Sequence, residues 1–213
     1  MNKFFTYSLL VVALILFGNC SESKLSTNDL ITYISDFDNG LRKTETINGI
    51  SFDLTYRSTD LIIDSQLSSR ALSQTVLDTL RQHYGGYYYF VLSLSTHDNQ
   101  EVLRPNQFSF NQYSELVQRM SFRMHEYVTL VTSADDSIFL SDYLLENTYG
   151  LASANTILLV FSKEDITPDA TWVQINLNEF GLGTGHLRFR FSLDEIRKCP
   201  SIDFSSKISL SSE

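Results

Sequence analysis

Cysteine, proline and histidine are scarce in this sequence. Its 213 residues include two cysteines, three prolines and four histidines, against 15 phenylalanines and 11 tyrosines. A disordered chain has the opposite balance, so this composition excludes intrinsic disorder and favours a folded core. The histidines stand at positions 83, 97, 125 and 186. That is not the spacing of a metal-ligand set, and we expect neither a metal centre nor a cofactor.

Basic residues are also few. Lysine and arginine together number 16, aspartate and glutamate number 25, and the formal net charge is −9 at pH 7. No stretch is basic enough to hold a phosphate backbone, so nucleic acid is excluded as a partner. The same acidic balance argues against adhesion to an anionic lipid surface, unless a lipid anchor holds the protein there.

An apolar run stands at the start of the chain. Ser8–Phe17 carries no charge, Lys3 precedes it, and Gly18–Cys20 ends it with small or polar groups. This order is typical of a secretory signal peptide. The run is about ten residues long, which is short of the roughly 20 that cross a bilayer. An uncleaved membrane anchor is therefore disfavoured.

A cysteine placed directly after the apolar run resembles the lipobox of bacterial lipoproteins. Phe17 and Asn19 depart from the Leu and the small residue typical of that motif. The resemblance implies a lipoprotein signal peptide over residues 1–19, cleavage before Cys20 and attachment of diacylglycerol to the Cys20 thiol. Ser21 does not resemble the inner-membrane retention signal of enteric lipoproteins, which implies an outer-membrane anchor in a Gram-negative cell. The alternative is a secreted protein in which Cys20 is incidental.

Cleavage before Cys20 leaves 194 residues with a formal net charge of −10, which suits one domain with a sizeable core. We expect a lipidated tether over residues 20–27, a single globular domain over residues 28–200 and a flexible, serine-rich tail over residues 201–213. With Cys20 lipidated, Cys199 has no partner within the chain and reads as a partly buried thiol. With Cys20 unmodified, the two cysteines could form a disulfide.

Helix signals concentrate in the earlier half of the chain. Four segments combine apolar residues at helical spacing with a cap or a stop. The first begins at Thr27 or Asn28, and the second spans Ser58–Leu67. The third spans Ser69–Tyr84 and stops at Gly85–Gly86, and the fourth follows the capping box Ser109–Gln112. Asp36–Gly40 is interpreted as a turn, because the residues behind it cannot complete a calcium loop.

Strand signals begin with a hairpin in the earlier half and dominate the chain from Glu126 onward. Asn48–Gly49 is the favoured pair for a type I′ turn and predicts a hairpin of Thr44–Ile47 with Ile50–Arg57. Further strands are expected at Tyr87–Thr96, Tyr127–Thr132, Thr156–Phe161, Val173–Leu177 and Leu187–Leu193. Ile138–Leu145 is ambiguous between strand and helix. The aromatic row at Tyr87–Phe90 allows a sugar-stacking platform, but we favour ordinary packing of good strand formers.

The sequence offers no catalytic motif. Gly181–His186 is rich in glycine, but it joins two strand patterns and so predicts a hairpin loop, not a phosphate cradle. His125–Glu126 lacks the second histidine of a zinc protease helix, and no Gly-x-Ser-x-Gly elbow is present. We predict no catalytic residue, although a pair of glycosidase carboxylates stays open.

Three stretches of the later half, Glu146–Leu151, Leu158–Phe161 and Gly181–Phe191, resemble lipoproteins of Bacteroidota type; this resemblance implies no activity. The predicted fold class is α+β: a mainly antiparallel sheet or sandwich with three to four helices, mostly in the earlier half.

The predicted function is non-catalytic, a binding or structural role of a lipid-anchored cell-envelope protein. Its partners are the membrane, through the lipid, and another envelope protein. The alternatives are an envelope hydrolase acting on glycans and an immunity or inhibitor lipoprotein.

Overall fold

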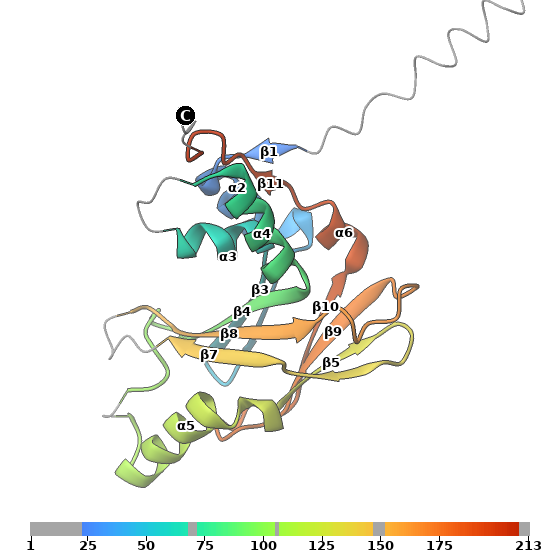
Figure 1. Ribbon diagram of the computed structural model, residues 1–213. Helices are drawn as coiled ribbons and strands as arrows, with labels where there is room; N and C mark the ends of the chain where they lie inside the picture. The colour runs from blue at the N-terminus through green and yellow to red at the C-terminus, as the bar shows by residue number, and fades with distance from the viewer. Residues whose placement is uncertain (1–22, 68–71, 105–106, 147–151, 209–213) are drawn as a thin grey trace, which may run out of the picture.

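The computed structural model describes residues 23–67, 72–104, 107–146 and 152–208 (Figure 1). This part of the chain confirms the predicted α+β class, with antiparallel sheets as its main component. It contains five α-helices, four of which precede residue 123. This is one helix more than the expected three to four. The additional helix is short, Leu193–Arg197, and lies in the later half of the chain.

Two antiparallel sheets form the body of the domain. The first has the order β2 (Arg42–Ile47), β3 (Ile50–Arg57), β4 (Tyr87–Thr96), β8 (Asn155–Ser162) and β7 (Asp142–Glu146). The second has the order β10 (Leu187–Ser192), β9 (Trp172–Leu177), β5 (Val128–Thr132) and β6 (Ser137–Phe139). The segment that was ambiguous between strand and helix is therefore two strands, one in each sheet.

The two sheets pack face to face around one core. Leu54 and Leu159 of the first sheet and Ile175 and Phe189 of the second enclose an interior with no room for a water molecule. The sheets also meet at their margins, because β6 leads directly into β7 and β10 contacts β2. The two sheets thus lie against each other along both margins, but no strand of one pairs with a strand of the other.

Serine starts every α-helix that the structure describes. The helices are α2 (Thr27–Ser35), α3 (Thr59–Gln66), α4 (Gln74–Gly85), α5 (Phe110–Phe122) and α6 (Leu193–Arg197), and short 3₁₀ turns occupy η1 (Phe37–Asn39) and η3 (Met124–Glu126). In each α-helix the preceding serine accepts a hydrogen bond from a first-turn amide, which satisfies an otherwise unpaired donor. The capping box of Ser109 and Gln112 is confirmed. The cap of α2 is Ser26, not Thr27 or Asn28 as expected, because Thr27 already lies inside the helix.

The helices divide between the two ends of the sandwich. Figure 1 shows α2, α3, α4 and α6 gathered at one end, and α5 at the other. No helix within the described ranges is long and apolar enough to cross a membrane.

The β2–β3 hairpin is confirmed. Asn48 and Gly49 both have positive φ, 52° and 77°, as a type I′ turn requires, and the strands pair from Ile47↔Ile50 to Arg42↔Thr55. The expected turn at Asp36–Gly40 is also present, as η1 followed by Gly40 in the left-handed region.

The boundaries of the tether and the tail are corrected by a pair of short parallel strands, β1 (Lys24–Leu25) and β11 (Ser201–Ile202). Ordered structure begins before residue 28, and residues 201–208 pack onto the domain instead of forming a flexible tail. The physical reason is two apolar side chains among the serines, Ile202 and Phe204, which are 2% and 3% exposed. Residues 209–213 lie outside the described residues.

Two residues of the aromatic row of β4, Tyr89 and Phe90, pack within the protein. Tyr89 is 5% exposed and joins Ile62 of α3 and Val160 of β8 in a small cluster on the outer face of the first sheet. Its hydroxyl donates to the Tyr84 carbonyl at 3.0 Å. The interpretation as a sugar-stacking platform is wrong for this side chain, because helices α3 and α4 cover it.

Candidate functional site

A cleft of about 440 Å³ opens at the end of the sandwich where α3 begins. Its wall combines residues from β1, β3, α3, α4 and β11, and the residues that matter here are Lys24, Tyr56, Thr59, Asp60, Arg81 and Ser201. We call it the α3 cleft. Its volume falls within the range of about 300–1,000 Å³ that small-molecule sites occupy.

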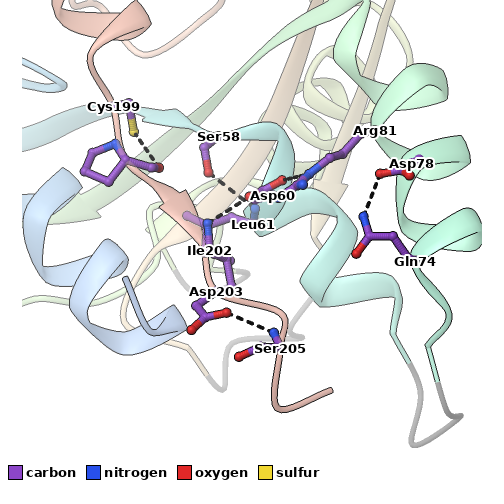
Figure 2. A network of polar contacts seen from close by, with 11 residues as sticks. Ser58, Asp60, Leu61, Gln74, Asp78, Arg81, Cys199, Ile202, Asp203 and Ser205 are labelled. Atoms are coloured by element: carbon purple, nitrogen blue, oxygen red, sulfur yellow. Dashed lines mark hydrogen bonds and ion pairs between the residues drawn. The ribbon is translucent and has the colours of Figure 1, made fainter. Parts of the chain in front are cut away.

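Asp60 is the polar centre of the α3 cleft (Figure 2). The residue as a whole is 6% exposed. Arg81 donates from Nε to Oδ1 at 2.9 Å and from Nη2 to Oδ2 at 2.8 Å. The Ile202 amide donates to Oδ2 at 2.8 Å. A buried charge needs this paired and hydrogen-bonded environment, and the three bonds tie α3, α4 and β11 together.

Two other groups in the wall have no partner. Tyr56 is 6% exposed, lines the cleft, and receives no hydrogen bond to its hydroxyl from the residues that the structure describes. The Ser201 Oγ also makes no hydrogen bond, but it has almost no solvent-accessible surface and so lies behind the surface of the cleft. Buried polar groups are nearly always paired, so the Tyr56 hydroxyl indicates where a ligand or water binds in the cleft.

The acidic groups of the wall other than Asp60 stay protonated at neutral pH. Burial raises the pKa of the Cys199 thiol to about 12, with a smaller contribution from the Asp60 charge. Burial likewise raises the pKa of the Tyr56 phenol well above its ordinary value. Both groups are therefore uncharged hydrogen-bond donors at pH 7, and neither is an activated nucleophile.

A second polar cluster lies in the β9–β10 loop, which the sequence predicted as a hairpin loop. The Glu179 carboxylate accepts five backbone amide hydrogen bonds, at 2.6–2.9 Å, from residues 181–185. Burial raises the pKa of Glu179, but the amide hydrogen bonds outweigh it and lower the pKa to about 2. The loop is thus an anion-binding concavity that its own glutamate already fills.

The residues singled out from the sequence are dispersed. Cys20 lies outside the described residues. Cys199 is a partly buried free thiol in the wall of the α3 cleft. Histidines 83, 97, 125 and 186 lie on separate elements, and no metal-binding group of three or more His, Cys, Asp or Glu side chains occurs in the described ranges.

Large apolar side chains are exposed singly. The most exposed are Ile31, Phe37, Val76, Tyr87, Phe110, Phe122, Phe139 and Leu144, which lie on seven different elements of the described structure. Single exposed apolar residues are normal on protein surfaces. They do not by themselves define the apolar patch that a protein-binding role predicts.

Sequence reasoning missed the residues of the α3 cleft. Asp60 and Ile202 are 142 residues apart, and an aspartate in the first turn of a helix is common for local electrostatic reasons. The usable signal was the clustering of polar residues at Ser58–Asp60, directly after a strand and before a helix.

We compared the chain with protein-family models, with curated protein sequences and with solved structures, and none of them matched.

Proposed function

We propose that the protein is a lipid-anchored, non-catalytic binding protein of the cell envelope, held at the outer membrane by Cys20. The apolar run, Cys20 and Ser21 support the anchor and its location. The observation that carries the binding role is the α3 cleft, which is large enough for a small ligand and is lined by the buried Tyr56, whose hydroxyl has no hydrogen-bond partner among the described residues.

The arrangement of carboxylates favours binding over hydrolysis. A glycosidase needs two carboxyl groups about 5–10 Å apart in its cleft. Among the described residues that line the α3 cleft, Asp60 is the one carboxylate, and three hydrogen bonds already occupy it. A glycan hydrolase therefore has no support from this cleft, and no feature marks an immunity or inhibitor protein.

The anchor is tested by growing cells with an alkyne-tagged fatty acid and measuring the intact mass of the purified protein. We expect label on the wild type, a mass that begins at Cys20, and loss of the label in Cys20→Ala. A Cys199→Ala variant is the matched control and should keep the label. Unlabelled wild-type protein cut at another position would refute the anchor.

The binding role is tested by crosslinking in intact membranes, with Ser201→Cys carrying a short thiol-reactive photo-crosslinker in the α3 cleft and Asp98→Cys carrying it at an exposed loop. A partner or ligand captured from the cleft but not from the loop supports the proposal. Turnover of envelope glycans that Asp60→Asn abolishes would instead establish a hydrolase.

A further inference from the structure

The wall of the α3 cleft is rich in hydrogen-bond donors. Lys24 and Arg81 contribute positive charge against the single negative charge of Asp60, so the lining carries one excess positive charge in a chain whose net charge is −9. The first turn of α3 adds the positive end of a helix dipole at Thr59 and Asp60. Positive potential concentrated in a cleft attracts anions even when the whole protein is acidic.

Asp60 does not cancel this potential. Arg81 holds the carboxylate with two charge-assisted bonds, and the Ile202 amide holds it with a third. Lys24, in contrast, makes no ion pair with the residues that the structure describes. The Lys24 charge lowers the pKa of the Asp203 carboxyl, but hydrogen bonds from Ser205 and burial both have larger effects on that pKa.

The unpartnered groups point to the same ligand chemistry. Tyr56 is more than nine-tenths buried, and its hydroxyl makes no hydrogen bond with a residue that the structure describes. This hydroxyl can donate to an oxyanion, and it lies in the wall that Lys24 borders. An anion with several oxygens would pair with the Tyr56 hydroxyl and the Lys24 ammonium at once, which a neutral apolar ligand could not.

We propose that the α3 cleft binds the phosphate or carboxylate group of a small anionic molecule, with Lys24 and Tyr56 as its donors. This deepens the proposed function and rests on it. The anion has two sources: a free solute, or the headgroup of a lipid in the membrane that carries the protein. Lys24 stands four positions after Cys20, and an extended chain of that length spans at most about 14 Å, so a headgroup is within reach.

The test titrates inorganic phosphate into the purified lipidated protein in phosphatidylcholine vesicles at pH 7, with chloride holding the ionic strength constant. Thermal unfolding is followed by the fluorescence of the single tryptophan, Trp172. A ligand that binds only the folded state raises the unfolding temperature in a saturable way. We expect such a rise, and an apparent affinity about tenfold weaker in Lys24→Gln, equivalent to one lost charge-assisted contact.

Two further variants separate binding from folding. Lys198→Gln removes the same charge from an exposed neighbouring lysine that does not line the cleft, and should leave the phosphate affinity within about twofold of the wild type. Tyr56→Phe should weaken phosphate binding without lowering the unfolding temperature of the ligand-free protein, because it deletes a hydroxyl that makes no hydrogen bond with a described residue. A purely structural tyrosine would not lose phosphate affinity while it kept its stability.

The titration is repeated in vesicles that contain phosphatidylglycerol to identify the source. If a headgroup occupies the cleft, these vesicles raise the unfolding temperature of the wild type but not of Lys24→Gln, and added phosphate has no further effect. If the ligand is a free solute, the phosphate titration is the same in both vesicles. The proposal is overturned if phosphate acts no differently from chloride, or acts equally on Lys24→Gln. Such a failure would leave the fatty-acid labelling result, and hence the anchor, untouched.

Discussion

The Glu179 loop offers the sharpest test of the structure, through the variant Glu179→Gln. A glutamine at this position presents one acceptor oxygen and an NH₂ donor to five backbone amides that now point at a carboxylate. The charged form of Glu179 is stabilised in the folded protein, since its pKa falls from an ordinary 4.5 to about 2. Linkage sets an upper limit of about 3 kcal/mol on this contribution at pH 7.

The measured loss should be smaller than this limit. Glu179 is an exposed residue, and solvent screens interactions of exposed charges. We therefore expect Glu179→Gln to lower the free energy of unfolding by about 1–2 kcal/mol at pH 7. Because the folded-state pKa is depressed, the contribution is complete above the unfolded pKa of about 4.5 and is lost as the pH falls toward 2.

The assay is urea unfolding of the wild type and Glu179→Gln at pH 7 and at pH 3. The difference in unfolding free energy between the two proteins should fall by half or more at the lower pH. Glu164→Gln is the control: this exposed glutamate lies in another loop, its side chain accepts no hydrogen bond from a described residue, and its substitution should cost less than about 0.5 kcal/mol. An equal difference at both pH values, or an equal loss in the control, would refute the reasoning.

Three further predictions concern other parts of the fold. Asp60→Asn removes the charge shared by Arg81 and the Ile202 amide, and should lower the free energy of unfolding by about 2–4 kcal/mol in urea. Asp78 is an exposed acceptor on α4, and Asp78→Asn should lower the free energy of unfolding by less than about 0.5 kcal/mol. Similar losses in the two variants would contradict the role of Asp60 as a buried, paired charge. The Cys199 thiol should react slowly with iodoacetamide at pH 8 in the folded Cys20→Ala variant, about a thousandfold more slowly than in the same variant unfolded in 8 M urea. The reason is that burial raises the pKa of Cys199 from 9.0 to about 12. Comparable rates in the two conditions would show an accessible thiolate. Gly49→Ala should cost about 1 kcal/mol, because its φ is 77°, whereas Gly86→Ala, at a φ of −72° with open space around it, should be nearly neutral in the same urea titration.

The sequence was most informative where structure is decided by neighbouring residues. The Asn48–Gly49 turn, the capping box at Ser109 and the alternation in β3 and β4 depend on residues a few positions apart, and all three are confirmed. The balance of helices and antiparallel strands followed from the same local patterns, and so the fold class was predictable.

The candidate site was not predictable, because it is built from distant segments. Ile202 reaches Asp60 only after the parallel pairing of β1 with β11, and two-residue strands have no periodicity to detect. The serine-rich composition of residues 201–208 masked Ile202 and Phe204, which anchor that segment in the core. The role of Glu179 was equally hidden, because its partners are backbone amides, which every sequence contains.

The short and charged edges of the two sheets have a consequence for the proposed location of the protein on a membrane surface. Open sheet edges present unpaired backbone groups that recruit strands from other copies. Here the margins are blunted: β6 has three residues and leads into β7, and β10 lies against β2. Charged side chains mark the other edges, with Asp142 and Glu146 on β7 and Arg188 and Arg190 on β10. If the proposed lipid anchor holds the protein at a membrane, its copies can therefore crowd together in two dimensions without joining their sheets into a continuous aggregate.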